Sequence, residues 1–187
     1  MSARYVFDKA DGRSTFTVQA FKTGLLSTFG HSPTFAVRDY AGEARFGDGG
    51  LASFAIELRV VADSLALLDR VGDADRREIE SRMREDVLET RSFPEISYQA
   101  ERLSDERISA GRYRVWIGGG LSVHGVTRPY QLDVELTVFE DALQIRGDCA
   151  LRLSNFQIKP VSALAGAIKL KDELRVVFDL LAPKETT

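Results

Sequence analysis

LDVELTVFEDALQIRGDCALRL, residues 132–153, alternates apolar and polar residues on both sides of the polar pair Glu140-Asp141. Because successive side chains of a strand point to opposite faces, each half is predicted to be a strand with one buried and one solvated face. The short polar interval predicts the tightest hairpin of the chain at Glu140-Asp141. Antiparallel pairing of half-buried strands is therefore the expected unit of the fold.

The same alternation recurs along most of the chain. It predicts eight strands, at residues 15–21, 34–46, 54–60, 95–101, 113–117, 132–138, 143–153 and 174–180. Turn-forming residues lie between several of them, at residues 47–50, 104–106 and 110–111. This pattern predicts an all-β fold whose strands are antiparallel where short turns join them.

Two segments depart from the alternation of strands. Residues 73–88 (DADRREIESRMREDVL) predict one long helix from Asp73 to Leu88, because Ile79, Met83 and Val87 recur every four residues and mark one face. Phe93-Pro94 lies just beyond and prevents the helix from continuing. Residues 23–32 (TGLLSTFGHS) are apolar and glycine-containing, and they predict a short helix or an ordered loop.

Length and composition indicate one globular domain over residues 1–187. Hydrophobic residues make up 44% of the chain, and 25 Lys and Arg balance 28 Asp and Glu, which gives a net charge of −3 and no general attraction to nucleic acid. Charged residues interrupt the N-terminal segment, and no stretch reaches the ~20 apolar residues of a membrane helix. The sequence therefore predicts a cytoplasmic protein without an integral membrane segment.

Eight such strands can curl into a barrel or form two facing sheets. Closure into a barrel removes the exposed edges, and an eight-stranded barrel either is filled by side chains or encloses one small ligand. The residues predicted to face the interior, and hence to line a ligand cavity, are Phe16, Val18, Phe35, Phe54, Ile56, Tyr98, Ile117, Val134, Ile145 and Cys149. Alternation indicates burial rather than empty space, so a barrel filled by these side chains, acting as an interaction module, is the alternative.

Residues for catalysis or metal binding are few. The chain has no Gly-x-Ser-x-Gly elbow and no P-loop, and its single cysteine, Cys149, lies on a buried strand face where a thiol is inert. The two histidines, His31 and His124, would need a carboxylate such as Asp39 or Glu43 to complete a metal site. We therefore predict no catalytic residue, no metal and no cofactor. An enzyme that uses His31 or His124 as acid–base is the alternative.

Residues 120–129 (GLSVHGVTRP) resemble the L-T-[IV]-H-G-V-T-[RK]-P signature of the YceI-like family. Three further segments resemble family elements in the same order, namely residues 62–65, 87–96 and 151–158, and the resemblance runs from about Gly12 to Leu181. Asn155 and Gln157 depart from it, because Asp and Gly are common at those positions in the family.

The resemblance implies a lipocalin-like, extended antiparallel β-barrel with a helix across one end. Members of this family bind polyisoprenoids, quinones or other long amphiphiles inside the barrel; many are periplasmic, and dimers are known. The leading hypothesis is therefore binding, storage or transport of a long-chain isoprenoid, quinone or fatty-acid-like lipid. His31, His124 and Arg128 are the candidate contacts to its polar head.

The head-group assignment has an alternative, and one further residue is a candidate contact of a partner chain. Residues 124–129 equally predict a tight turn, in which Gly125 supplies an unusual backbone angle and polar side chains satisfy backbone groups. Trp116 is expected on the face opposite Val115 and Ile117, where it is a candidate contact of a homodimer.

Overall fold

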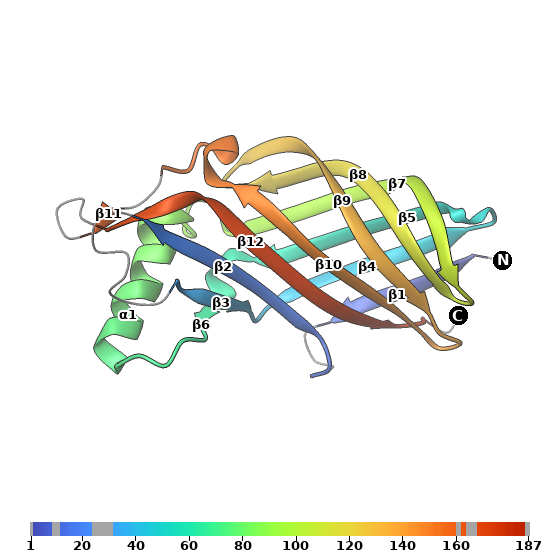
Figure 1. Cartoon of the computed structure of the whole chain (residues 1–187), viewed down its shortest axis with the longest axis horizontal. Coiled ribbons are helices and arrows are strands. Elements are labelled where there is room, and N and C mark those ends of the chain that lie inside the picture. Colours follow the sequence, from blue (N-terminus) through green and yellow to red (C-terminus); the bar gives the residue numbers. More distant parts are fainter. Residues whose placement is uncertain (1, 9–11, 24–31, 160–161, 164–167, 186–187) are drawn as a thin grey trace.

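The computed structural model describes residues 2–8, 12–23, 32–159, 162–163 and 168–185. Within them the strands form one antiparallel sheet of twelve strands, which curls strongly along its length (Figure 1). A single α-helix lies across one end of the curled sheet, and the first strand lies at the opposite end (Figure 1). The all-β class with one helix and a curled antiparallel sheet is confirmed.

The strands follow the chain as β1 (Ala3–Asp8), β2 (Thr15–Thr23), β3 (Thr34–Val37), β4 (Tyr40–Gly47), β5 (Gly50–Val61), β6 (Leu65–Leu67), β7 (Glu95–Ser109), β8 (Arg112–Val123), β9 (Val126–Val138), β10 (Ala142–Arg152), β11 (Ser162–Ala163) and β12 (Ile168–Pro183). Their order across the sheet is β1-β4-β5-β7-β8-β9-β10-β12-β2-β3-β6, and β11 pairs with β12. Neighbours in sequence pair from β7 to β10, as expected for hairpins.

The curl brings the two flanks of the sheet together. β2 pairs with β3 on one flank, and β3 runs almost directly into β4, which pairs with β1 and β5 on the other flank. At the far end, Tyr5 of β1 forms a bridge with Lys184, just past β12. The Glu185 amide also donates to the Arg4 carbonyl at 2.8 Å. These contacts leave an interior that the sheet surrounds.

The predicted count of eight strands needs correction. Residues 34–46 form two strands rather than one, because the chain leaves the ladder at Arg38 and Asp39 between β3 and β4. β1 was missed because charges interrupt its apolar pairs, and β6 and β11 have only three and two residues, too few to show a period. The difference lies in how the strands divide, and the fold class is unaffected.

Two predicted turns also differ from the structure. Residues 104–106 lie inside β7, next to a register shift between Arg102 and Ser104, so the turn before β8 is made by Ala110-Gly111 alone. The hairpin at Glu140-Asp141, where the Phe139 amide donates to the Ala142 carbonyl at 2.8 Å, is matched in length by two others. His124-Gly125 and Ala110-Gly111 are also two-residue loops, because Val123 pairs with Val126 and Ser109 with Arg112. Positive φ angles at both His124 and Gly125 make the His124-Gly125 loop compatible with the strand twist.

The predicted helix is present with a modified last turn. α1 (Asp73–Arg82) continues into a π-helical turn (Met83–Val87) that is capped at Leu88, where the Leu88 amide donates to the Met83 carbonyl at 2.9 Å. No α1 residue is fully buried; Ile79 packs against the core, and the side chains of Glu80 and Arg76 bond α1 to Leu67 of β6. The helix therefore lies over the interior as a cover rather than as part of a packed core.

Residues 24–31 lie outside the described part of the chain, so the short helix or ordered loop predicted around them stays a prediction. Among the described residues, no helix combines the length and apolar character needed to span a bilayer. Trp116 is half-buried on the face opposite Val115 and Ile117, as predicted. The homodimer and the cytoplasmic location stay predictions.

Candidate ligand cavity

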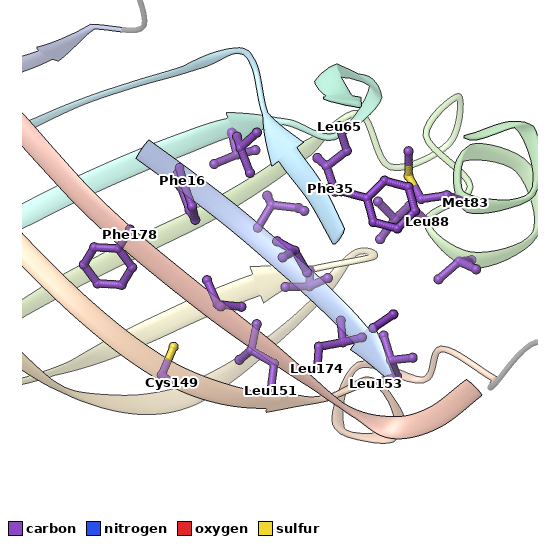
Figure 2. Close-up of a pocket in the computed structure, with 18 of the residues that line it drawn as sticks. Phe16, Phe35, Leu65, Met83, Leu88, Cys149, Leu151, Leu153, Leu174 and Phe178 are labelled. Carbon is purple, nitrogen blue, oxygen red and sulfur yellow. The ribbon is translucent and has the colours of Figure 1, made fainter. Parts of the chain in front are cut away.

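The interior contains a cavity of about 710 Å³ between α1 and the middle of the curled sheet. Side chains of β2, β5, β8, β9, β10 and β12 form its walls, and the helical segment covers one end. Figure 2 shows Met83 and Leu88 beside Phe35 at the helical end, with Cys149 and Phe178 farther along the strands. The volume lies within the range of sites for small molecules, about 300–1,000 Å³.

The boundary of the cavity crosses five strands. β5, β8 and β9 each carry two successive inward-facing residues with different surroundings. The one farther from α1 is tightly packed, and the one nearer α1 lines the cavity. These pairs are Phe54 and Ile56, Val115 and Ile117, and Leu136 and Val134. β10 and β12 repeat the pattern with Leu143 and Ile145, and with Ala182 and Leu180. The curled sheet is thus solid in one half and hollow in the other.

β1 contributes to the solid half. Tyr5 and Phe7 are buried in the same cluster as Phe54, and the Tyr5 ring meets Phe46 edge-on at 5.7 Å between centroids. Phe46 and Phe54 are 5.1 Å apart between centroids. Aromatic rings from three strands therefore fill the end of the interior that α1 does not cover.

Nine of the ten apolar residues predicted to face the interior line this cavity. They are Phe16, Val18, Phe35, Ile56, Tyr98, Ile117, Val134, Ile145 and Cys149. Phe54 does not, because it is only 1% exposed and packed against Phe46 in the solid half. The period-two pattern identifies the inward face of each strand, and it carries no information about the level at which packing gives way to space.

His124 does not line the cavity. Its ring packs on Phe93 with 4.2 Å between ring centroids, and its Nε2 lies 3.1 Å from Glu89 Oε1 beyond the end of the helix. Gly125 has φ +71, and a Cβ there would lie 2.6 Å from the Phe93 ring. The tight-turn interpretation therefore describes this stretch: a hairpin held under Phe93, with no contact to the cavity.

Arg128 also lies away from the cavity lining. Its Nε donates to the Asn155 carbonyl at 3.2 Å, which ties β9 to the 3₁₀ turn Leu153–Phe156. The tie matters because the ladder between β9 and β10 stops at the pair Gly147–Val134, so the two strands separate beyond it. His124 and Arg128 thus lie outside the cavity lining, and the head-group role predicted for them stays a prediction.

His31 lies outside the described residues, so its predicted role stays a prediction. No group of three His, Cys, Asp or Glu side chains within the described segments is arranged to hold a metal ion. Of the two completing ligands named above, Glu43 pairs with Arg4 and Arg45. The backbone amide of Asp39 donates to Ser64 Oγ at 3.0 Å.

Apart from Ser97, the polar residues that line the cavity fall into two sets. Charged residues occur near α1 and the ends of neighbouring strands, and these are Asp69, Asp75, Glu78, Arg82 and Arg152. Glu78 and Arg82 pair at 2.9 Å, as their i,i+4 spacing on the helix predicts. Sequence reasoning missed this charged set, because only the folded chain brings α1 next to the end of β10.

The second polar set lies on the wall and comprises Tyr98, Tyr130 and Cys149. The Tyr98 hydroxyl donates to the Tyr130 carbonyl at 3.1 Å, and the Tyr130 hydroxyl donates to the Ala150 carbonyl at 2.6 Å. Burial raises the pKa of Tyr98 to about 12, and it raises the pKa of Tyr130 and of the Cys149 thiol as well. All three side chains are therefore uncharged at neutral pH.

Comparison with known proteins agrees with this architecture. A family model described as the YceI-like domain matches residues 5–182. No curated protein matches the chain. The crystal structure of Burkholderia cenocepacia BcnA is similar, with a TM-score of 0.68 at 13% identity over 94% of this chain and 99% of that one.

A second similar structure is that of the Campylobacter jejuni YCEI protein, with a TM-score of 0.56 at 14% identity over 80% of this chain and 84% of that one. At such identities the structural likeness concerns the fold. The family model covers nearly the whole chain and spans every segment on which the sequence resemblance rests. The chain belongs to the YceI-like family.

Proposed function

We propose that the protein binds one long-chain amphiphilic lipid, such as a polyisoprenoid, a quinone or a fatty acid, and so stores or carries it. The observation that supports this most directly is a cavity of about 710 Å³ whose walls are almost entirely aliphatic and aromatic side chains. Burial of apolar surface contributes about 25 cal/mol per Å². A hydrocarbon chain is held in such a space without specific polar contacts.

The shape of the interior favours a chain over a compact ligand. The lining extends along the strands, from Met83 and Leu88 at the helical cover to Phe16 and Phe178 farther along the sheet (Figure 2). Charged residues are confined to the neighbourhood of α1 and the adjoining strand ends. This separation suits an amphiphile whose tail lies along the walls, since a buried charge without a partner is costly.

Binding is proposed in preference to catalysis because of where the candidate acid–base residue lies. His124 packs on Phe93 outside the cavity lining, and no other histidine belongs to the described residues. The tyrosine hydroxyls on the wall donate to backbone carbonyls and are uncharged at neutral pH. These groups are suited to shaping a cavity rather than to transferring protons at neutral pH.

The test begins with protein purified without detergent. Organic extraction should release a lipid in about one-to-one amount, and native mass spectra should show a matching adduct. Spectra free of any adduct, together with no uptake of added palmitate or of a quinone with an isoprenoid tail, would contradict the proposal.

A cavity-filling substitution gives a second test. Leu151 lines the cavity, so Leu151→Trp should occupy space needed by the ligand and weaken palmitate binding at least tenfold. Leu103→Trp is the matched control, because Leu103 is 51% exposed and lies outside the lining. Circular dichroism would verify that both variants keep the fold. Equal palmitate affinity in both variants would argue against binding in this cavity.

A further inference from the structure

The uncharged polar groups on the cavity wall form a cluster on three strands. Tyr98 comes from β7, Tyr130 from β9 and Cys149 from β10, and all three line the cavity. The two tyrosine rings meet edge-on with 6.5 Å between centroids. The Cys149 thiol lies within hydrogen-bond reach of the Tyr130 hydroxyl. We refer to Tyr98, Tyr130 and Cys149 as the wall cluster.

Both tyrosine hydroxyls of the wall cluster already donate a hydrogen bond to a backbone carbonyl. Tyr98 donates to the Tyr130 carbonyl at 3.1 Å, and Tyr130 donates to the Ala150 carbonyl at 2.6 Å. The second bond lies where the β9–β10 ladder has ended at Gly147–Val134, so the side chain replaces a backbone partner. Redirecting either proton toward a ligand would leave a carbonyl without that donor, which carries a cost.

The phenol oxygens keep the capacity to accept. A hydroxyl oxygen that donates one hydrogen bond still has lone pairs for incoming donors, and donation strengthens it as an acceptor. Burial keeps Tyr98, Tyr130 and Cys149 protonated well above neutral pH. The cluster thus presents acceptors without charge, inside walls that disfavour an ionised ligand group.

We propose that the wall cluster is a subsite for a hydrogen-bond donor and selects ligands that carry a hydroxyl, namely long-chain alcohols or hydroquinones. Ethers and oxidised quinones, which only accept, are disfavoured because the two tyrosine hydroxyls cannot donate to them without breaking the Tyr98 or Tyr130 hydrogen bond, and the Cys149 thiol is a weak donor. The inference rests on the proposed function, since it concerns the polar group of a lipid in the same cavity.

The experiment compares two isomeric probes that differ in whether the oxygen carries a proton, dodecan-1-ol and 1-methoxyundecane. Each displaces the neutral fluorophore N-phenyl-1-naphthylamine from the full-length protein. One net hydrogen bond predicts about three- to tenfold tighter binding of the alcohol. A featureless apolar cavity would favour the ether instead, because the alcohol loses more hydration on entry. Equal affinities, or preference for the ether, would overturn the inference while lipid binding stands.

The variants locate the selection. In the double variant Tyr98→Phe/Tyr130→Phe, the affinity for the alcohol divided by the affinity for the ether should fall to about one or below. Tyr98→Phe alone is also measured, in case the double variant is unstable. Tyr113→Phe is the matched control, because Tyr113 lies on β8 outside the lining and should keep the wild-type ratio. A wild-type ratio retained without the two hydroxyls would refute the assignment. Displacement by neither probe would instead contradict the proposed function itself.

Discussion

At the scale of single residues, unusual backbone angles gather where the chain turns near the helical end. Glu89, His124 and Gln157 are the non-glycine residues with positive φ in the described chain. Gln157 has φ 60 and stands where glycine is common in the family, which gives a physical reason for that glycine. His124 takes the place that Asn holds in many type I′ turns. The family signature around His124 is therefore explained by backbone geometry.

Gly125 combines two constraints that substitution can separate. It has φ +71, and a Cβ there would lie 2.6 Å from the Phe93 ring, whereas Gly12 has φ +63 and open space around it. Gly12→Ala should cost about 1–2 kcal/mol from the backbone angle alone. Gly125→Ala should cost about 2–4 kcal/mol, because Phe93 must also move. Urea unfolding of both variants gives the comparison, and equal losses would show that Phe93 does not clamp the hairpin.

Tyr98 predicts an alkaline limit to stability. Its folded pKa is about 12, above the ordinary value of 10.0, because burial disfavours the phenolate. The unfolded chain releases this proton first as pH rises, so the stabilisation is fully present below pH 10 and is lost between about 10 and 12. Urea midpoints across this range should fall less steeply in Tyr98→Phe than in the wild type. Parallel slopes would contradict this contribution from Tyr98.

At the scale of elements, side chains replace backbone pairing at two places around the cavity. β9 and β10 separate beyond Gly147 and are joined there by Tyr130 and Arg128. α1 is held to β6 by Glu80, which accepts from the Leu67 amide at 2.9 Å, and by Arg76, which donates to the Leu67 carbonyl. Arg76 also donates to the carbonyl of Asp69, just beyond β6, at 2.8 Å. The walls nearest the cavity thus depend on a few polar contacts.

The two glutamates of α1 provide a matched test of this anchoring. Glu80 is 16% exposed, accepts from the Leu67 amide and lies 3.5 Å from Arg84, whereas Glu78 is 63% exposed and pairs with Arg82 on the same helix. Glu80→Ala should lower the free energy of unfolding by about 1–2 kcal/mol and speed amide exchange in α1. Glu78→Ala should change it by about 0.5 kcal/mol or less. Similar losses in the two variants would argue against Glu80 as an anchor.

At the scale of the whole molecule, the interior is divided between a packed half and a hollow half. Phe7, Phe54 and Leu143 are almost fully buried in the packed half, at the end opposite α1. Among the lining residues, Phe16, Leu174 and Phe178 are partly accessible, whereas Ile117 and Ile145 are almost fully buried. Stability is therefore expected to reside mainly in the half that cannot take a ligand.

Identical truncations in the two halves test this division. Leu143→Ala removes a side chain with no exposed surface and should cost about 3–5 kcal/mol, near the upper end for buried leucines. Leu174→Ala enlarges an existing cavity and should cost about 1–2 kcal/mol in ligand-free protein, because fewer packing contacts are lost. Chemical denaturation of both variants supplies the numbers. A cost at Leu174 equal to that at Leu143 would mean that the second half is packed as well.

The sequence alone determined the inward face of most strands, the helix from Asp73 to Leu88 and the family, because each depends on a local period or a short motif. It correctly placed Ile56 and Val134 in the interior, yet it placed Phe54 in the same cavity. Only the tertiary structure decided where packing ends, since that depends on β1 inserting Tyr5 and Phe7 from a distant part of the chain. It likewise decided that the hydroxyl of Tyr98 meets β9, because hydrogen-bond partners across a curled sheet follow from register rather than from spacing in the sequence.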